Sequence, residues 1–151
     1  MQTLDFLARV YGNDKGWVDI PSKVNGHWIK WLREWPDGIE TTKRRIKSSM
    51  DEDLYFSCMM FSENQRRHDL ALPGRWLFAD LDLVAPDVCI RKGLMPTVCW
   101  ESSPGHFQAL WRLSRRVKPH SLEKMNRMLT YASRIIRSRI FPMAQPVGPG
   151  S

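Results

Sequence analysis

The segment from residue 76 to residue 82, Trp-Leu-Phe-Ala-Asp-Leu-Asp, joins a short apolar run to two aspartates. Side chains alternate between the faces of a β-strand, so Asp80 and Asp82 should point the same way, while Leu81 points into the opposite layer. Two carboxylates this close repel each other, and a bound divalent cation is the usual relief. Acids at the end of an apolar strand also cost stability unless they are compensated. The segment therefore predicts a strand that delivers a metal site.

A second informative segment, residues 101–111, reads Glu-Ser-Ser-Pro-Gly-His-Phe-Gln-Ala-Leu-Trp. Its Ser-Ser-Pro-Gly run predicts a turn over residues 102–105, and the alternating residues after it predict a strand over residues 106–113. One face of that strand should carry His106, Gln108 and Leu110. The other face should carry Phe107, Ala109 and Trp111.

The rest of the chain alternates predicted helices and strands, which indicates a mixed α/β (α+β) fold. Strands are expected at residues 16–20, 54–61 and 97–100, with a charged connection over residues 62–72. Helices are expected at residues 4–11, 27–35 and 121–139, with a helix or an exposed loop at residues 41–50. We expect one domain over residues 1–141, and a disordered tail or cloning remnant over residues 142–151.

Tryptophans are concentrated in the helix expected at residues 27–35. Trp28, Trp31, Leu32 and Trp35 have helical spacing, which favours a packing role for them. A role in stacking nucleic-acid bases is the alternative.

Positive charge is concentrated near the carboxyl end. The chain has a formal net charge of +7. Residues 112–139 hold nine basic residues and one acid, Glu123. A positive field of this kind suits a polyanion such as nucleic acid or a nucleoside triphosphate, and a solvated helix face is the alternative. The expected apolar stripe of the last helix contains Leu122, Met125, Met128, Leu129, Ala132, Ile135 and Ile136.

Cysteine usage and hydropathy exclude several classes of protein. Cys58, Cys89 and Cys99 have no paired spacing, so we expect reduced core thiols rather than disulfides or a zinc ribbon. No apolar run approaches the roughly 20 residues that span a bilayer, and the amino terminus lacks the pattern of a secretory signal. We therefore expect a cytoplasmic protein that has no membrane partner.

The aspartate pair, followed by the Ser-Ser-Pro-Gly turn and its polar strand, resembles the first two motifs of the archaeo-eukaryotic primase superfamily. The nearest forms are the primases and primase-polymerases of phages and plasmids, and the resemblance covers residues 54–113. It implies an RRM-like catalytic core, with a mixed or antiparallel sheet flanked by helices. It also implies that Asp80 and Asp82 hold Mg²⁺ or Mn²⁺ for catalysis.

The same resemblance assigns the second motif to the incoming nucleotide. Ser103 and His106 match the residues that contact the triphosphate, and His106 joins the aspartates as a catalytic residue. The register leaves Gln108 as the alternative to His106, because amide and imidazole groups both bind phosphate oxygens. Arg112 is a further candidate for binding the nucleotide. The candidates for binding nucleic acid are Arg115, Arg116, Arg127, Arg134 and Arg137.

The implied function is metal-dependent synthesis or extension of primers on a single-stranded DNA template during phage or plasmid replication. Nucleoside triphosphates are the substrates, and a replicative helicase is an expected partner. A metal-dependent nuclease that uses the same aspartates is one alternative. A catalytically degenerate DNA-binding module of a replication initiator is the other.

A third acidic motif, which the family places on a later strand, has no match here. No aspartate follows Asp87, and the only later glutamates are Glu101 and Glu123. Three explanations are open: the chain ends before the motif, another acid substitutes for it, or the domain only binds. The expected disordered tail favours the first.

Overall fold

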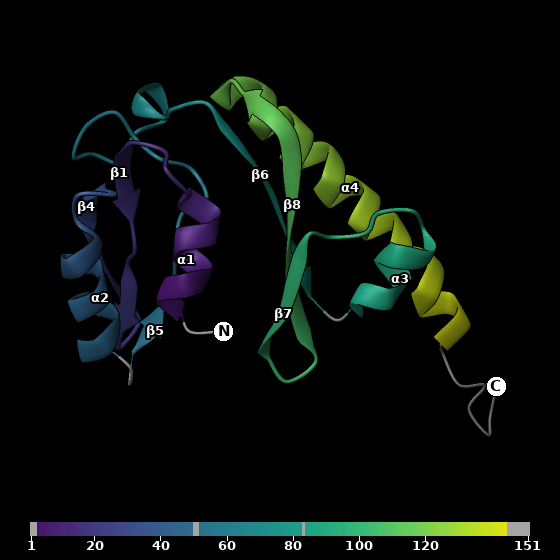
Figure 1. Ribbon diagram of the computed structural model, residues 1–151. Coiled ribbons are helices and arrows are strands. Elements are labelled where there is room, and N and C mark those ends of the chain that lie inside the picture. The colour runs from purple at the N-terminus through teal and green to yellow at the C-terminus, as the bar shows by residue number, and fades with distance from the viewer. Residues whose placement is uncertain (1–2, 50–51, 83, 145–151) are drawn as a thin grey trace. The chain divides into compact units, whose positions relative to one another are not determined.

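The computed structural model describes residues 3–49, 52–82 and 84–144, which form a mixed α/β fold with antiparallel strand pairs (Figure 1). Within these residues the α-helices are α1 (Thr3–Tyr11), α2 (Ile39–Ser48), α3 (Pro86–Arg91) and α4 (Pro119–Ala144). The first five strands are β1 (Gly16–Asp19), β2 (Ser22–Val24), β3 (His27–Ile29), β4 (Leu32–Trp35) and β5 (Asp53–Leu54). A 3₁₀ turn, η1 (His68–Leu70), precedes β6 (Gly74–Asp82), β7 (Val98–Ser103) and β8 (His106–Val117).

The chain divides into two compact units. The first contains Met1–Gly74 and Arg115–Pro119, and the second contains Arg75–Ser114 and His120–Ser151. In the first unit β1 pairs with β4, and a second sheet has the order β3-β2-β5. Its buried side chains include Leu7, Val10, Tyr11, Val18, Ile20, Leu32 and Trp35.

The helix predicted for residues 27–35 is wrong, because this segment forms β3 and β4. Asn25 and Gly26 have φ angles of 49° and 80°, the left-handed values that a two-residue type I′ hairpin turn requires. The turn pairs β2 with β3 in antiparallel register. Trp35 is buried, as a packing role predicts, but 57% of Trp28 is exposed.

The strand predicted for residues 54–61 is also shorter than expected. Only Asp53–Leu54 forms β5, and the chain then follows β1 without a regular ladder. Ser57 N–H donates to the Asp19 carbonyl, while Phe61 and Trp17 exchange backbone hydrogen bonds. Separate backbone hydrogen bonds therefore tie this segment to β1, although no continuous strand forms.

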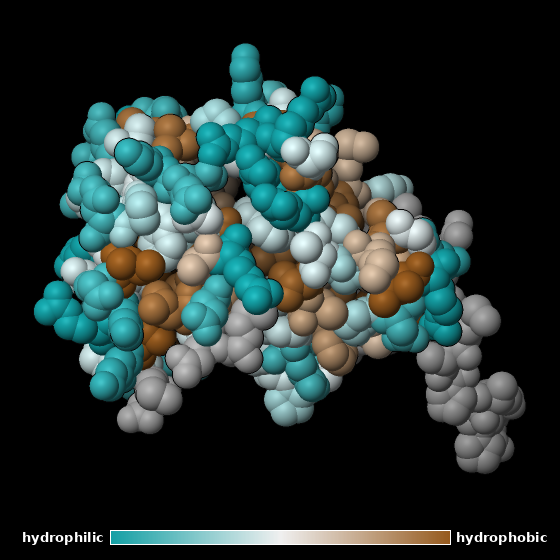
Figure 2. All heavy atoms as spheres, in the orientation of Figure 1, coloured by the Kyte–Doolittle hydropathy of each residue, from teal (hydrophilic) through white to brown (hydrophobic). Residues whose placement is uncertain are grey.

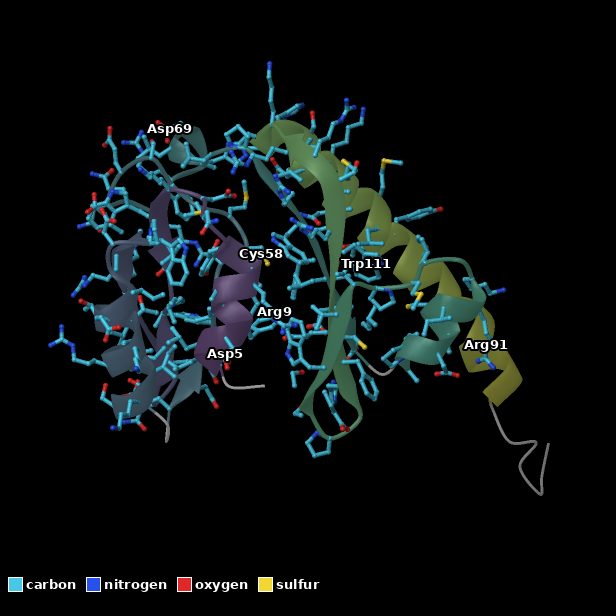
Figure 3. All side chains as sticks on the ribbon, in the orientation of Figure 1. Asp5, Arg9, Cys58, Asp69, Arg91 and Trp111 are labelled. Atoms are coloured by element: carbon cyan, nitrogen blue, oxygen red, sulfur yellow. The ribbon has the colours of Figure 1, made fainter. Side chains whose placement is uncertain are left out.

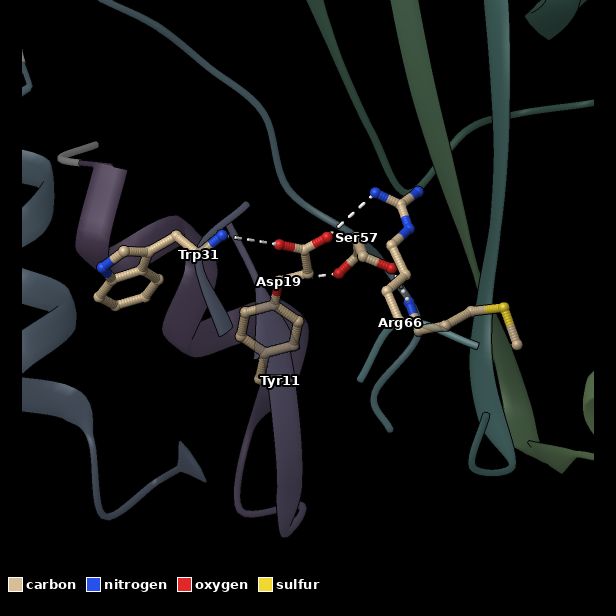
Figure 4. A network of polar contacts seen from close by, with 6 residues as sticks. Tyr11, Asp19, Trp31, Ser57 and Arg66 are labelled. Atoms are coloured by element: carbon tan, nitrogen blue, oxygen red, sulfur yellow. Dashed lines mark hydrogen bonds and ion pairs between the residues drawn. The ribbon is translucent and has the colours of Figure 1, made fainter. Parts of the chain in front are cut away.

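A buried carboxylate organises the interior of the first unit (Figure 4). Asp19 is 1% exposed, and its two oxygens accept hydrogen bonds from Trp31 N–H at 3.4 Å and from the Arg66 guanidinium at 3.1 Å. Nearby, the Tyr11 hydroxyl donates to the Ser57 carbonyl at 2.8 Å. Burial raises the pKa of Tyr11 well above its ordinary value, and the neighbouring Cys58 and Asp19 add to the effect.

The second unit is built on a three-stranded sheet with the order β6-β8-β7. A buried cluster lies on one face of this sheet, where Ala79 and Leu81 of β6 meet Ala109 of β8 and Cys89 of α3. Leu129 of α4 packs against the same cluster. The two helices of this unit therefore contribute to one core on one face of the sheet.

Two hydrogen bonds tie the borders of this core. The Trp111 indole N–H donates to the Leu94 carbonyl at 3.3 Å, on the side of β8 where α4 lies (Figure 3). On the edge strand β6, Phe78 N–H donates to the Asn126 side chain of α4 at 3.0 Å. A backbone donor at the edge of the sheet is thus satisfied by a helix.

The last helix is longer than predicted. It runs from Pro119 to Ala144, so residues 142–144 are helical rather than a disordered tail, while residues 145–151 lie outside the described residues. Leu122 is buried, but Met128 is 64% exposed and does not belong to the apolar stripe. Asn126 takes part in the inward face instead. The side chains of Ile135 and Ile136 lie outside the described part.

The cysteines are free thiols, but they are not all core residues: Cys89 is buried, Cys58 is half-buried and Cys99 is exposed. Burial raises the pKa of Cys58 to about 12. Figure 2 shows one face of the surface, largely hydrophilic with apolar groups in small patches. Among the described residues, no helix has the length and apolar character needed to cross a membrane.

Candidate functional site

Strand β6 carries the aspartate pair as the alternation predicts. Leu77, Ala79 and Leu81 are buried, whereas Asp80 is exposed and Asp82 is partly exposed. At the end of the strand Asp82 adopts a φ of 53°, in the left-handed region. Its N–H donates to Asp80 Oδ1 at 3.1 Å, so the first aspartate holds the backbone of the second. This local hydrogen bond from backbone to side chain holds the Asp80 carboxylate against the backbone of Asp82 at the end of the strand.

The second motif lies on the hairpin between β7 and β8. Gly105 has a φ of 77°, a backbone conformation that would be strained in a residue with a side chain. Its N–H donates to Glu101 Oε1 at 2.7 Å. The register shifts between Glu101 and Ser103, which brings Ser103 opposite His106. The Ser102 hydroxyl donates to the His106 carbonyl at 3.2 Å. The turn thus places His106 at the very start of β8.

The structure brings the two motifs together. His106 Nδ1 lies 2.7 Å from Asp82 Oδ1, and the side chains of the two residues are 46% and 39% exposed. The pair forms a hydrogen bond when Nδ1 carries the proton, and an ion pair when the ring is charged. His106 and the aspartates therefore form one group on the sheet face opposite the helices.

The face of β8 that carries His106 also carries two other predicted site residues. Ala109 belongs to the core on the other face, so His106, Gln108 and Arg112 share the face of the aspartates. Gln108 lies opposite Trp100 of β7, and Arg112 is exposed. The predicted alternation of β8 is confirmed, and its polar face meets the end of β6.

The other basic candidates come from the end of β8 and from α4. Arg115 and Arg116 belong to the first compact unit, where Arg116 forms an ion pair with Asp14. Arg127 is exposed on α4 and pairs with Glu123 at 3.0 Å. Arg134 and Arg137 also lie on α4, but their side chains lie outside the described part.

Glu101 does not complete a third acidic position. Glu101 lies opposite Phe107, whose side chain packs against the helix-covered core. One carboxylate oxygen of Glu101 already accepts a hydrogen bond from Gly105 N–H in the turn. In the described ranges, no cluster of three or more His, Cys, Asp or Glu side chains is arranged as a metal site.

The chemistry of the donor set still fits a hard divalent cation. Mg²⁺ commonly binds one or two carboxylates, and waters and substrate phosphates complete its octahedral shell. Asp80 and Asp82 supply two carboxylates, and the first accepts a hydrogen bond from the backbone N–H of the second. They would be the protein ligands, and the nucleotide would supply further oxygens.

Comparisons of this chain with protein-family models, curated proteins and solved structures found no match.

Proposed function

We propose that the chain is a catalytic domain of the archaeo-eukaryotic primase type, with an RRM-like core built on β6, β7 and β8. It would join nucleotides to a primer on a single-stranded DNA template in phage- or plasmid-type replication. The observation that carries the proposal is the 2.7 Å contact between His106 and Asp82, which unites the two motifs. A nuclease or a degenerate DNA-binding module remains an outcome of the test.

The reaction needs groups that this sheet face can supply. The 3′-oxygen of the primer attacks the α-phosphorus, the bond to the bridging oxygen breaks, pyrophosphate leaves, and the hydroxyl proton passes to solvent. A bound Mg²⁺ or Mn²⁺ would lower the pKa of the attacking hydroxyl and neutralise the triphosphate. Asp80 and Asp82 would hold this cation.

The remaining residues would bind and orient the nucleotide. His106 holds the Asp82 carboxylate through Nδ1–H, and when the ring is charged its Nε2–H can also donate to a phosphate oxygen. Ser103 lies opposite His106 across the hairpin, and Gln108 and Arg112 follow along the same face of β8. A hydroxyl, an amide and a guanidinium all bind phosphate oxygens.

The test is incorporation of labelled nucleotide on primed and unprimed single-stranded DNA, with Mg²⁺ or Mn²⁺. Asp80→Asn should lower incorporation at least about a hundredfold, because loss of a carboxylate weakens the hold on a cation that contributes several kcal/mol. Asp87→Asn is the matched control, since Asp87 is an exposed aspartate that pairs with Arg91 on α3. Its activity should equal that of the wild type.

Each alternative function gives a distinct result in the same assay. Asp80-dependent degradation of the DNA without added nucleotide would identify a nuclease. DNA binding with neither synthesis nor degradation would identify a binding module. Full synthesis by Asp80→Asn would overturn the assignment of the metal site.

A further inference from the structure

Two aromatic side chains of the first unit are exposed and in contact. Trp28 is 57% exposed and Tyr55 is 40% exposed, and their ring centroids are 4.7 Å apart at an interplanar angle of 61°. An exposed tryptophan on a strand gains little from folding, because its apolar surface stays in water. The pair therefore has surface left over for a ligand.

The strand register places this pair on one face of the β3-β2-β5 sheet. Trp28 of β3 and Asp53 of β5 both lie directly opposite Lys23 of β2, so the three residues share a face. Tyr55 follows Asp53 by two residues, and its N–H continues the pairing to the Pro21 carbonyl. Its side chain reaches across β2 to meet Trp28 on that face.

Positive charge accompanies the rings. The Lys23 ammonium lies 5.6 Å from the centroid of Trp28, within the range of a cation–π contact. Residues 22–47 contain seven basic and three acidic residues. The exposed basic side chains of this stretch are Lys23, Lys30, Arg33, Lys43, Arg44 and Lys47. A polyanion that carries flat rings complements both the exposed aromatic side chains and the basic residues.

We propose that this aromatic face, formed by Lys23, Trp28 and Tyr55, binds single-stranded DNA by stacking bases on the exposed rings. The inference rests on the proposed function, because it names the surface that would hold the template strand. Unpaired bases can stack on a protein ring, whereas the bases of a duplex are stacked on each other. The positive charge of Lys23 attracts the phosphates of the strand.

Asp53 makes one side of this face unfavourable for the phosphates of the bound strand. Its carboxylate repels phosphate and lies on the β5 side of Lys23. The backbone of the DNA therefore runs on the β3 side, near Lys23 and Lys30. A protein ligand is the less favoured occupant, because charged residues flank the two rings.

The test measures binding of a labelled thymidine oligonucleotide, and of an abasic oligonucleotide of equal length, in EDTA and without nucleotide. Wild type should prefer the thymidine strand, because only that strand can stack. Trp28→Ala should bind it at least about 5-fold more weakly, which corresponds to about 1 kcal/mol for one stacked base. Binding of the abasic strand should not change.

Matched variants separate stacking from folding. Ile29→Ala is the control, because Ile29 is 47% exposed, follows Trp28 on the same strand and points to the opposite face. Its affinity should equal that of the wild type. Trp28→Phe keeps a ring and should retain part of the preference. Asp53→Asn should tighten binding.

Photocrosslinking of bromodeoxyuridine DNA to unmodified protein gives a readout that needs no variant. Crosslinks at Trp28 or Tyr55 are expected, and crosslinks confined to other residues would overturn the inference. Wild-type affinity and preference in Trp28→Ala would overturn it too. If Trp28→Ala abolishes self-association of the protein but leaves DNA binding unchanged, the aromatic face is a protein interface and the inference is overturned. If wild type binds in this way but synthesises nothing, only the proposed function fails.

Discussion

His106 Nδ1 and Asp82 Oδ1 lie 2.7 Å apart, although the two residues are 24 positions apart in the sequence. The contact gives the histidine two separable tasks. Through Nδ1–H it orients a carboxylate of the metal pair, and through the Nε2–H of its charged form it can donate to a phosphate oxygen of the nucleotide. Different replacements can preserve one task at a time.

His106→Asn and His106→Gln should divide these tasks. The amide nitrogen of Asn lies near the place of Nδ1 and can still donate to Asp82, whereas that of Gln lies near the place of Nε2. If orienting Asp82 dominates, Asn should retain more kcat than Gln. If binding of phosphate dominates, Gln should retain the lower KM for nucleotide.

The matched measurement for this prediction is steady-state incorporation over a range of nucleotide concentrations, with His106→Ala as the reference that loses both tasks. Gln108→Ala is tested alongside, because Gln108 is the alternative triphosphate contact on the same face of β8. A raised KM in Gln108→Ala, with a normal KM in His106→Ala, would transfer the role to Gln108.

The backbone of Asp82 predicts how well this position tolerates substitution. A φ of 53° costs a residue with an ordinary side chain about 1–2 kcal/mol, and asparagine and aspartate tolerate this conformation best. Asp82→Asn should therefore unfold in urea like the wild type, although it loses activity. Asp82→Ala should be about 1 kcal/mol less stable. Equal unfolding midpoints for the two variants would show that the left-handed conformation is not retained in solution.

The basic face of α4 predicts a salt-dependent contribution to DNA binding. Each phosphate contact on a single strand contributes about −0.7 to the slope of log K against log salt. Replacing Arg127, Arg134 and Arg137 with Glu should weaken binding without sequence preference and flatten that slope. Circular dichroism checks the fold, and a folded variant with wild-type affinity and slope would show that this helix face is only solvated.

Glu123→Gln provides the opposite change on the same helix. Glu123 accepts a hydrogen bond from the Arg127 guanidinium at 3.0 Å. Removing its charge should free the guanidinium for phosphate, so binding should become tighter at low salt. Both side chains are largely exposed, so stability should change by less than about 0.5 kcal/mol.

Alkaline pH should destabilise the first unit. The pKa of Cys58 rises from 9.0 to about 12 on burial, and the pKa of Tyr11 is raised as well. Both groups keep their protons more tightly when folded, so their contribution is intact below about pH 9 and falls as the pH rises toward 12. Urea midpoints at pH 8 and pH 10.5 measure the loss. Cys58→Ala should reduce it, and an unchanged loss would contradict this origin.

The second unit was the more predictable part of the fold. The two-residue period of residues 76–82 correctly separated buried from exposed side chains on β6. On residues 106–113 it correctly placed Phe107, Ala109 and Trp111 together, because that face of β8 packs against the helical layer. In the first unit, the helix expected over residues 4–11 forms as α1, because its apolar spacing agrees with the tertiary structure.

The helix prediction for residues 27–35 in the first unit was wrong because two sequence patterns overlap there. The spacing of Trp28, Trp31 and Trp35 suits a helix, but the Asn25-Gly26 dipeptide is the strongest short-range mark of a hairpin. Tertiary pairing decided in favour of the hairpin. The Asn-Gly pair could have revealed that Trp28 lies on a strand.

Long-range contacts of single side chains were not accessible to sequence reasoning. The Asp19–Arg66 pair joins β1 to a connecting segment, and no local period marks either residue. Likewise, nothing in the spacing of the two motifs required His106 to touch Asp82. Such contacts depend on how the strands are ordered in a sheet, which the alternation within a single strand does not specify.

The first unit is discontinuous in the sequence, since Arg115–Pro119 belongs with Met1–Gly74. A ribosome therefore makes all of Arg75–Ser114 before it makes the partner of Asp14, which is Arg116. At roughly 5–20 residues per second this delay lasts a few seconds. During that time the nascent amino-terminal half is without one of its own segments, so its final closure awaits the synthesis of a strand that begins in the other half.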